Sequence, residues 1–153
     1  MGKTSLISRF VEQKFSEQYL ASIGLKVDKK TVQVEYHTLD LIIWDVAGQD
    51  NVDNIPHYYL NGSHGIIFVA DLTRPATYID IGQRIARLRQ LVPQATFVVA
   101  ANKKDLVPTQ ELATILQQFA IPPDVITSAK TGDEVETLFL LLAKHILSSH
   151  DAA

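Results

Sequence analysis

The chain contains no cysteine, and this absence removes several kinds of chemistry. Without thiols there are no disulfides, no thiolate metal ligands and no cysteine nucleophile. A prenyl anchor also requires a cysteine near the carboxyl end, so the sequence has no signal for that direct lipid anchor. A cysteine-free composition suits a cytoplasmic protein, and we predict that location.

Long apolar runs and a strong charge bias are absent as well. No run approaches the ~20 apolar residues needed to span a bilayer, and residues 138–143 are among the longest. Lys3, Arg9 and Glu12 interrupt any apolar core of a signal peptide. The net charge of -3 argues against general attraction to nucleic acid or anionic lipid.

The pattern that remains is typical of one globular domain in which strands and helices alternate. A length of 153 residues is enough for a proper core. Alternating or continuous apolar residues predict strands at 31–34, 39–44, 65–70, 96–101 and 125–126. Residues 15–28 and 45–56 are polar and irregular, which predicts two loops. We expect an α/β fold with a mostly parallel sheet flanked by helices.

Four helices are expected between these strands. Leu6, Ile7, Phe10 and Val11 recur at helical spacing after Lys3, and a second apolar stripe runs from Tyr78 to Val92. Thr109 is a candidate N-cap for a third helix. Residues 131–134 fit a capping box at the start of the fourth. Ligands of such folds bind at the carboxyl ends of the strands.

The amino end carries a short phosphate-binding pattern. Gly2, Lys3 and Thr4 match the last three positions of the P-loop signature G-x-x-x-x-G-K-[ST], whose first half is missing here. A helix beginning near Lys3 would point its positively polarised amides at a bound phosphate. The triplet alone is a weak signal, because three residues recur by chance.

Polar residues directly after the second apolar strand suit metal and water chemistry. Asp45 could orient a hydrated Mg²⁺, which needs only one or two protein oxygens besides phosphate. Gly48 lets its amide approach a phosphate oxygen, and Gln49 could orient an attacking water. Taken alone, Asp45 is more typical of a turn or a helix cap than of a metal site.

Polar residues after the two later strands suit recognition of guanine. The Asp105 carboxylate can accept from both adjacent donors of guanine, whereas adenine offers one donor and one acceptor, a mismatch of roughly 1–3 kcal/mol. Asn102 can bridge backbone and base, and the stem of Lys103 can lie along the ring. Ser128, Ala129 and Lys130 would bring backbone amides to the guanine carbonyl oxygen. Lys104 is expected to be solvated.

Together these motifs resemble, in order and spacing, those of the Ras-like small GTPases, and the Rab branch most closely. The resemblance covers essentially the whole chain and implies a guanine-nucleotide switch that hydrolyses GTP to GDP with Mg²⁺. It implies that Lys3 binds the β- and γ-phosphates, that Thr4 and Ser22 donate hydroxyls to Mg²⁺, and that Gln49 positions water. Ser22 stands where the family has Thr. The resemblance also places Ser5, Phe15 and Tyr19 at the nucleotide.

The resemblance also implies the domain bounds, the turnover and the partners of the protein. Residues 1–148 would form the GTPase domain and residues 149–153 a short tail. The central first strand of the family's sheet and half of the P-loop are missing, and we expect them to be encoded upstream. No arginine is placed to assist hydrolysis, so turnover should be slow without an activating protein; exchange and effector proteins are further expected partners. A nucleotide-binding scaffold, or a domain of a larger regulatory protein without efficient hydrolysis, is the alternative.

Overall fold

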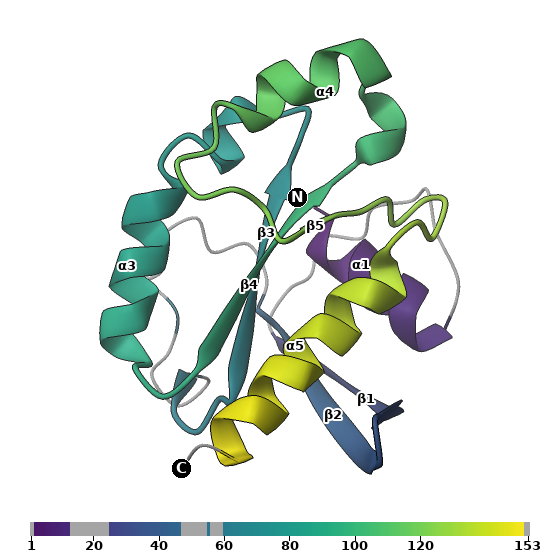
Figure 1. The fold of residues 1–153 in the computed structure, drawn as a ribbon, viewed down its shortest axis with the longest axis vertical. Helices are drawn as coiled ribbons and strands as arrows, with labels where there is room; N and C mark the ends of the chain where they lie inside the picture. The colour runs from purple at the N-terminus through teal and green to yellow at the C-terminus, as the bar shows by residue number, and fades with distance from the viewer. Residues whose placement is uncertain (1, 13–24, 47–54, 56–59, 152–153) are drawn as a thin grey trace.

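The computed structural model describes residues 2–12, 25–46, 55 and 60–151, and it confirms the α/β class (Figure 1). Two short 3-10 turns, Pro75–Thr77 and Lys104–Leu106, lie between the main elements. The helices and strands follow in the order α1 (Lys3–Glu12), β1 (Leu25–Val34), β2 (His37–Val46), β3 (Gly65–Asp71), α3 (Ile81–Leu91), β4 (Thr96–Asn102), α4 (Thr109–Leu116), β5 (Val125–Ile126) and α5 (Val135–Asp151).

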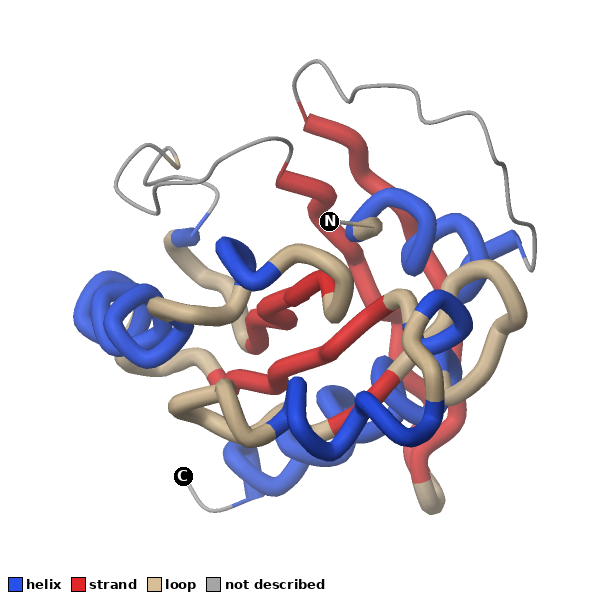
Figure 2. The backbone as a smooth tube through the Cα atoms, turned by 90° about the horizontal axis from the view of Figure 1, so that it is seen from above, coloured by secondary structure: helices blue, strands red, loops and turns tan. Residues whose placement is uncertain are grey.

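The strands form two sheets. β3, β4 and β5 pair in parallel in the order β3-β4-β5, and β1 pairs with β2 in an antiparallel hairpin. Among the residues that the structure describes, no strand joins β2 to β3. Figure 2 shows the hairpin and the three-stranded sheet as separate groups of strands.

Helices cover both faces of the parallel sheet. Val69, Val98 and Ala100 face α1 and α5, and their neighbours on the other face pack toward α3 and the segment after α4. Burial on both faces explains why these strands read as continuous apolar runs rather than alternating ones. Phe10 of α1 stacks on Phe139 of α5 with ring centroids 4.0 Å apart, which joins the two helices.

The hairpin strands are longer than predicted. Residues 25–28, predicted to lie in a loop, belong to β1, and the two strands pair from Leu25 with Val46 to Val34 with His37. Ladder pairing uses backbone groups, so the polar side chains that indicated a loop do not prevent it. Glu35 takes the left-handed turn conformation, with a φ of 57°, where Gly or Asn is usual.

The hairpin packs through one face only. Val32 and Val34 are buried, while Val27, Ile42 and Trp44 on the opposite face are about half exposed. The strand at 39–44 is therefore apolar on both faces in sequence but covered on one. No helix among the described ranges is long and apolar enough to cross a membrane.

Two predicted helix caps are wrong. α4 begins at Thr109 itself, after Pro108 at the cap position, and no side chain caps it. α5 begins at Val135, and the preceding Glu134 has a φ of 59°, so residues 131–134 form a turn rather than a capping box. Thr131 Oγ1 instead accepts a hydrogen bond from the Asp133 amide within that turn. Both patterns occur in turns as readily as at helix starts.

Candidate functional site

The carboxyl ends of the strands meet at the amino end of α1, as expected for a ligand site in this class of fold. Asp71 ends β3 directly opposite Asn102, which ends β4. Gly2 lies against Asn102: a Cβ added to Gly2 would fall 2.3 Å from Asn102 Nδ2. Gly2 also has a φ of 88°, so both space and conformation favour glycine there.

The start of α1 is joined to the end of β2 by two side-chain contacts. The Lys3 ammonium donates to the carbonyl oxygen of Val46 at 2.7 Å. The Thr4 hydroxyl donates to Asp45 Oδ2 at 2.5 Å. Ser5 follows in the same first turn and is half-buried. Lys3, Thr4 and Asp45, which the sequence placed at phosphate and metal, therefore lie together.

Asp45 carries an unsatisfied buried oxygen. Its side chain is 2% exposed, and Oδ1 has no hydrogen-bond partner among the residues that the structure describes. The described ranges hold no cluster of three or more acidic or histidine side chains for a metal. A cation here would draw on one carboxylate and one hydroxyl, with water and phosphate completing its shell. That donor set fits Mg²⁺, which retains several waters.

The segments after β4 and β5 hold one another through side chains. Asn102 is 2% exposed, and its Oδ1 accepts from the Thr127 hydroxyl at 3.1 Å and from the Ala129 amide at 3.2 Å. The buried Ser128 hydroxyl donates to Asp105 Oδ1 at 2.8 Å. Asp105 itself is exposed, so its carboxylate is fixed at one oxygen and open to a ligand.

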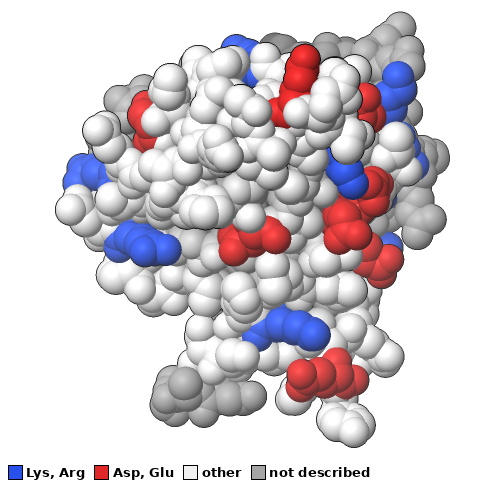
Figure 3. Space-filling view, turned by 45° about the horizontal axis from the view of Figure 1, so that its top comes forward, with Lys and Arg blue, Asp and Glu red and all other residues white. Residues whose placement is uncertain are grey.

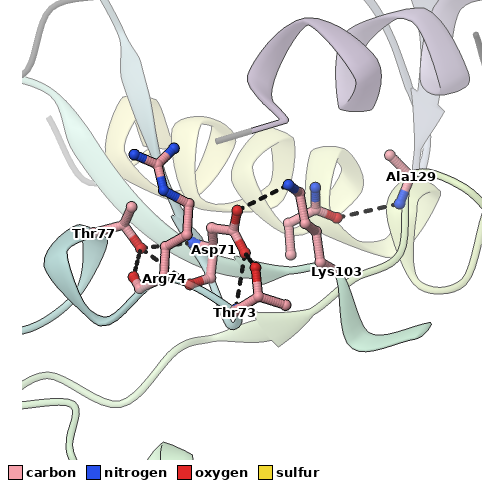
Figure 4. A network of polar contacts seen from close by, with 7 residues as sticks. Asp71, Thr73, Arg74, Thr77, Lys103 and Ala129 are labelled. Atoms are coloured by element: carbon pink, nitrogen blue, oxygen red, sulfur yellow. Dashed lines mark hydrogen bonds and ion pairs between the residues drawn. The ribbon is translucent and has the colours of Figure 1, made fainter. Parts of the chain in front are cut away.

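The two lysines between Asn102 and Asp105 have different partners. Lys104 forms a 2.8 Å ion pair with Asp133, and this contact raises the pKa of Lys104. Lys103 has a left-handed φ of 74°, and its ammonium lies 2.9 Å from Asp71 Oδ2 (Figure 4). The predicted solvated character of Lys104 holds only in part, because its side chain is ion-paired although still about half exposed.

Asp71 belongs to none of the sequence motifs. The structure shows it fully buried at the end of β3. Oδ1 accepts from the Thr73 amide at 2.8 Å and from the Thr73 hydroxyl at 2.6 Å. Burial by itself raises the pKa of Asp71, but the hydrogen bonds from Thr73 and the ion pair with Lys103 outweigh it, so the pKa lies below its ordinary value. Asp71 follows an apolar strand as Asp45 does, and that position could have identified it.

Arg9 is the second residue that the motifs did not identify. From the last turn of α1 it donates through Nε to the carbonyl oxygen of Ala129 at 2.8 Å and through Nη2 to that of Lys130. These contacts hold the loop of Ser128, Ala129 and Lys130 against α1. No local pattern marks Arg9, since it looks like one of several polar residues on a helix.

The remaining predicted residues, Phe15, Tyr19, Ser22, Gly48 and Gln49, lie outside the described residues. The space-filling view also shows acidic and basic side chains interspersed on the face that it draws (Figure 3). On that face the molecule presents no broad surface of one charge. This agrees with the small net charge.

Comparison with known proteins gives a consistent result over nearly the whole chain. A family model described as "Ras family" matches residues 1–148. The chain is 33% identical to the human Ras-related protein Rab-4B over 156 aligned positions, which cover 99% of this chain and 73% of the relative. It is 31% identical to Rab-4 of Dictyostelium discoideum (99% and 77% covered) and 32% identical to the GTP-binding protein ypt1 of Schizosaccharomyces pombe (95% and 74% covered).

Proposed function

The chain belongs to the Ras family of small GTPases, and from this premise we propose that it is a Mg²⁺-dependent molecular switch that hydrolyses GTP to GDP. The observation that carries the proposal is the exposed Asp105 carboxylate, fixed at one oxygen by Ser128 Oγ. A pre-oriented carboxylate can accept from both the ring N–H and the exocyclic amine of guanine. Adenine would leave one oxygen facing an acceptor.

The base would be recognised by the segments after β4 and β5. Asp105 accepts from guanine, the stem of Lys103 lies along its ring, and amides of residues 128–130 reach its carbonyl oxygen. Asn102 acts mainly by holding these segments together, because its Oδ1 already accepts from Thr127 and Ala129. The two donors on Asn102 Oδ1 support this assignment, since a buried amide oxygen with two partners is rigidly placed.

The phosphates and the cation would be held at the start of α1. Lys3 binds the β- and γ-phosphates beside the helix N-terminal amides, and Gly48 adds an amide. Thr4, Ser22 and Asp45 hold Mg²⁺, directly or through its waters, and bound Mg²⁺ supplies charge that stabilises the transferring phosphoryl group. The unsatisfied Oδ1 of Asp45 supports this role, because hydrated Mg²⁺ would satisfy it.

Hydrolysis would depend on positioning rather than on a strong base. Gln49 has a donor and an acceptor, so it can orient a water for attack on the γ-phosphate while Lys3 offsets the developing charge. We propose slow turnover that an activating protein accelerates by about 10³–10⁵. Exchange and effector proteins are the further partners of such a switch, and a cytoplasmic location remains part of the proposal. The comparisons favour this switch over a nucleotide-binding scaffold without useful hydrolysis.

Nucleotide binding and turnover by the full chain test the proposal. We expect bound GDP rather than ADP in the purified protein, and a GDP affinity that falls on addition of EDTA. Release of γ-³²P-phosphate from GTP should be lost in Gln49→Leu and retained in Gln83→Leu, which changes an exposed glutamine on α3. Equal affinity for GDP and ADP would contradict the base assignment, and equal turnover of the two variants would contradict the role of Gln49.

A further inference from the structure

The ion pair between Lys103 and Asp71 crosses from one strand end to the next. Asp71 and Asn102 are paired across β3 and β4, and the Leu72 amide donates to the Asn102 carbonyl oxygen at 3.0 Å. Lys103 is therefore the first residue past the paired ladder. Figure 4 shows its side chain extending toward Asp71, with the ammonium at the carboxylate.

Asp71 is built as a fixed anchor. Its side chain is 0% exposed, and Oδ1 is held by two donors of Thr73. Its own amide donates to the Thr77 hydroxyl at 2.9 Å, so the backbone is fixed as well. Lys103 is the only partner that Oδ2 has in the described part of the chain, and the contact is a close ion pair rather than a well-aligned hydrogen bond. A buried carboxylate with one oxygen left for one ammonium constrains where that ammonium can lie.

The backbone conformation and the exposed side chain of Lys103 leave its stem poorly fixed without the ion pair. Its φ of 74° lies in the left-handed region, which is unfavourable for a residue with a Cβ. Its side chain is 37% exposed, so without a partner the four-carbon stem could rotate freely in solvent. The ion pair holds the end of the stem while the 3-10 turn Lys104–Leu106 holds its base.

We infer that Asp71 is a positioning residue for nucleotide binding, which acts by holding the stem of Lys103 where it lies along the ring of the bound guanine. This inference rests on the proposed function and extends it to a residue outside the four motifs. A lysine stem that is already in place loses less conformational freedom when a base packs against it. Asp71 thus slows nucleotide release without contacting the nucleotide.

The test is the dissociation rate of N-methylanthraniloyl-GDP from the full chain in a double-mutant cycle. Asp71→Asn should accelerate release about 10-fold, as expected when a charge-assisted contact worth about 1.4 kcal/mol is lost. In the Lys103→Met background the same substitution should change the rate by less than about twofold, because the residue through which Asp71 acts is gone. An equal acceleration in both backgrounds would show that Asp71 only supports the fold and would overturn the inference.

Two further measurements keep the result decisive. If Asp71→Asn does not fold, Thr73→Val replaces it: this exposed position loses one donor to Asp71, and release should accelerate by a smaller factor that again requires Lys103. If the wild-type chain retains no GDP, the proposed function fails, and the ¹H–¹⁵N signal of the Lys103 ammonium in the free protein decides the positioning. A signal present in wild type and lost in the Asp71 or Thr73 variant supports an anchored stem, and an unchanged signal refutes it.

Discussion

Asp45 gives a prediction in which one substitution changes the sign of its effect with conditions. The side chain is 2% exposed, Oδ2 accepts from Thr4, and Oδ1 has no partner among the described residues. A buried polar atom without a partner costs roughly 1–3 kcal/mol, and more when it is charged. Asp45→Asn keeps an oxygen for the Thr4 hydroxyl and removes the charge.

In EDTA and without nucleotide, Asp45→Asn should therefore raise the free energy of unfolding by about 1–2 kcal/mol. At about 2–4 °C per kcal/mol for a domain of this size, the midpoint should rise by roughly 2–8 °C. With Mg²⁺ and GDP, wild type should have the higher unfolding midpoint. Ligand binding stabilises the folded state, and it should stabilise wild type more than the variant. Thermal unfolding followed by circular dichroism in both buffers measures the two shifts.

Asp71→Asn is the matched control, since it changes another buried aspartate at a strand end. Both oxygens of Asp71 have partners, so removing its charge breaks an ion pair and weakens the Thr73 contacts. We expect a lower midpoint in both buffers, by a modest amount because Lys103 is partly exposed. A midpoint for Asp45→Asn in EDTA that is lowered as much as that of Asp71→Asn would refute the reasoning about Oδ1.

Three further predictions concern nucleotide recognition by Asp105, the contacts of Arg9, and the stability of the protein at acid pH. Asp105→Asn places an amide donor opposite a donor of guanine, so GDP affinity should fall by about 10–100-fold. Xanthosine diphosphate has a carbonyl in place of the exocyclic amine, so it should bind the variant more tightly than it binds wild type. Calorimetry measures both affinities. Arg9→Met should lower the midpoint by about 2–8 °C through loss of two hydrogen bonds to loop carbonyls, whereas Arg87→Met, at an exposed site on α3, should change it by less than about 2 °C. Because the folded pKa of Asp71 is lowered, its carboxylate stabilises the fold above the ordinary value of 3.8 and this contribution is lost as the pH falls through the lower folded value. The midpoint difference between wild type and Asp71→Asn should thus be constant near neutrality and shrink below pH 3.8, and a difference that stays constant in acid would contradict it.

The sequence predicts the parallel sheet well because burial on both faces requires continuous apolar runs. The predicted strands at 65–70, 96–101 and 125–126 match the bounds of β3, β4 and β5 to within one residue. The same reasoning brings Asn102 and the segment after β5 to one edge, since parallel strands end together. Asp71 also ends a parallel strand, at the same edge. The sequence alone did not select it, because only residues that belong to a motif were considered.

Features that depend on contacts distant in sequence are predicted poorly. Residues 25–28 are polar, and their pairing with β2 follows from the opposite strand rather than from their own side chains. Thr109 and Thr131 match capping patterns, but the backbone around Pro108 and Glu134 decides where α4 and α5 begin. Arg9 reaches carbonyls some 120 residues away, and no local spacing indicates that contact.

The separation of the hairpin from the three-stranded sheet has a consequence for how the molecule can open. Among the described residues these two groups of strands meet through side-chain packing of α1 and α5, without a shared ladder. Amide hydrogen exchange should therefore resolve β1 and β2 as a cooperative unit distinct from β3 and β4. Because Asp45 belongs to the first unit and Asn102 to the second, a ligand that touches both would couple their opening and slow exchange throughout.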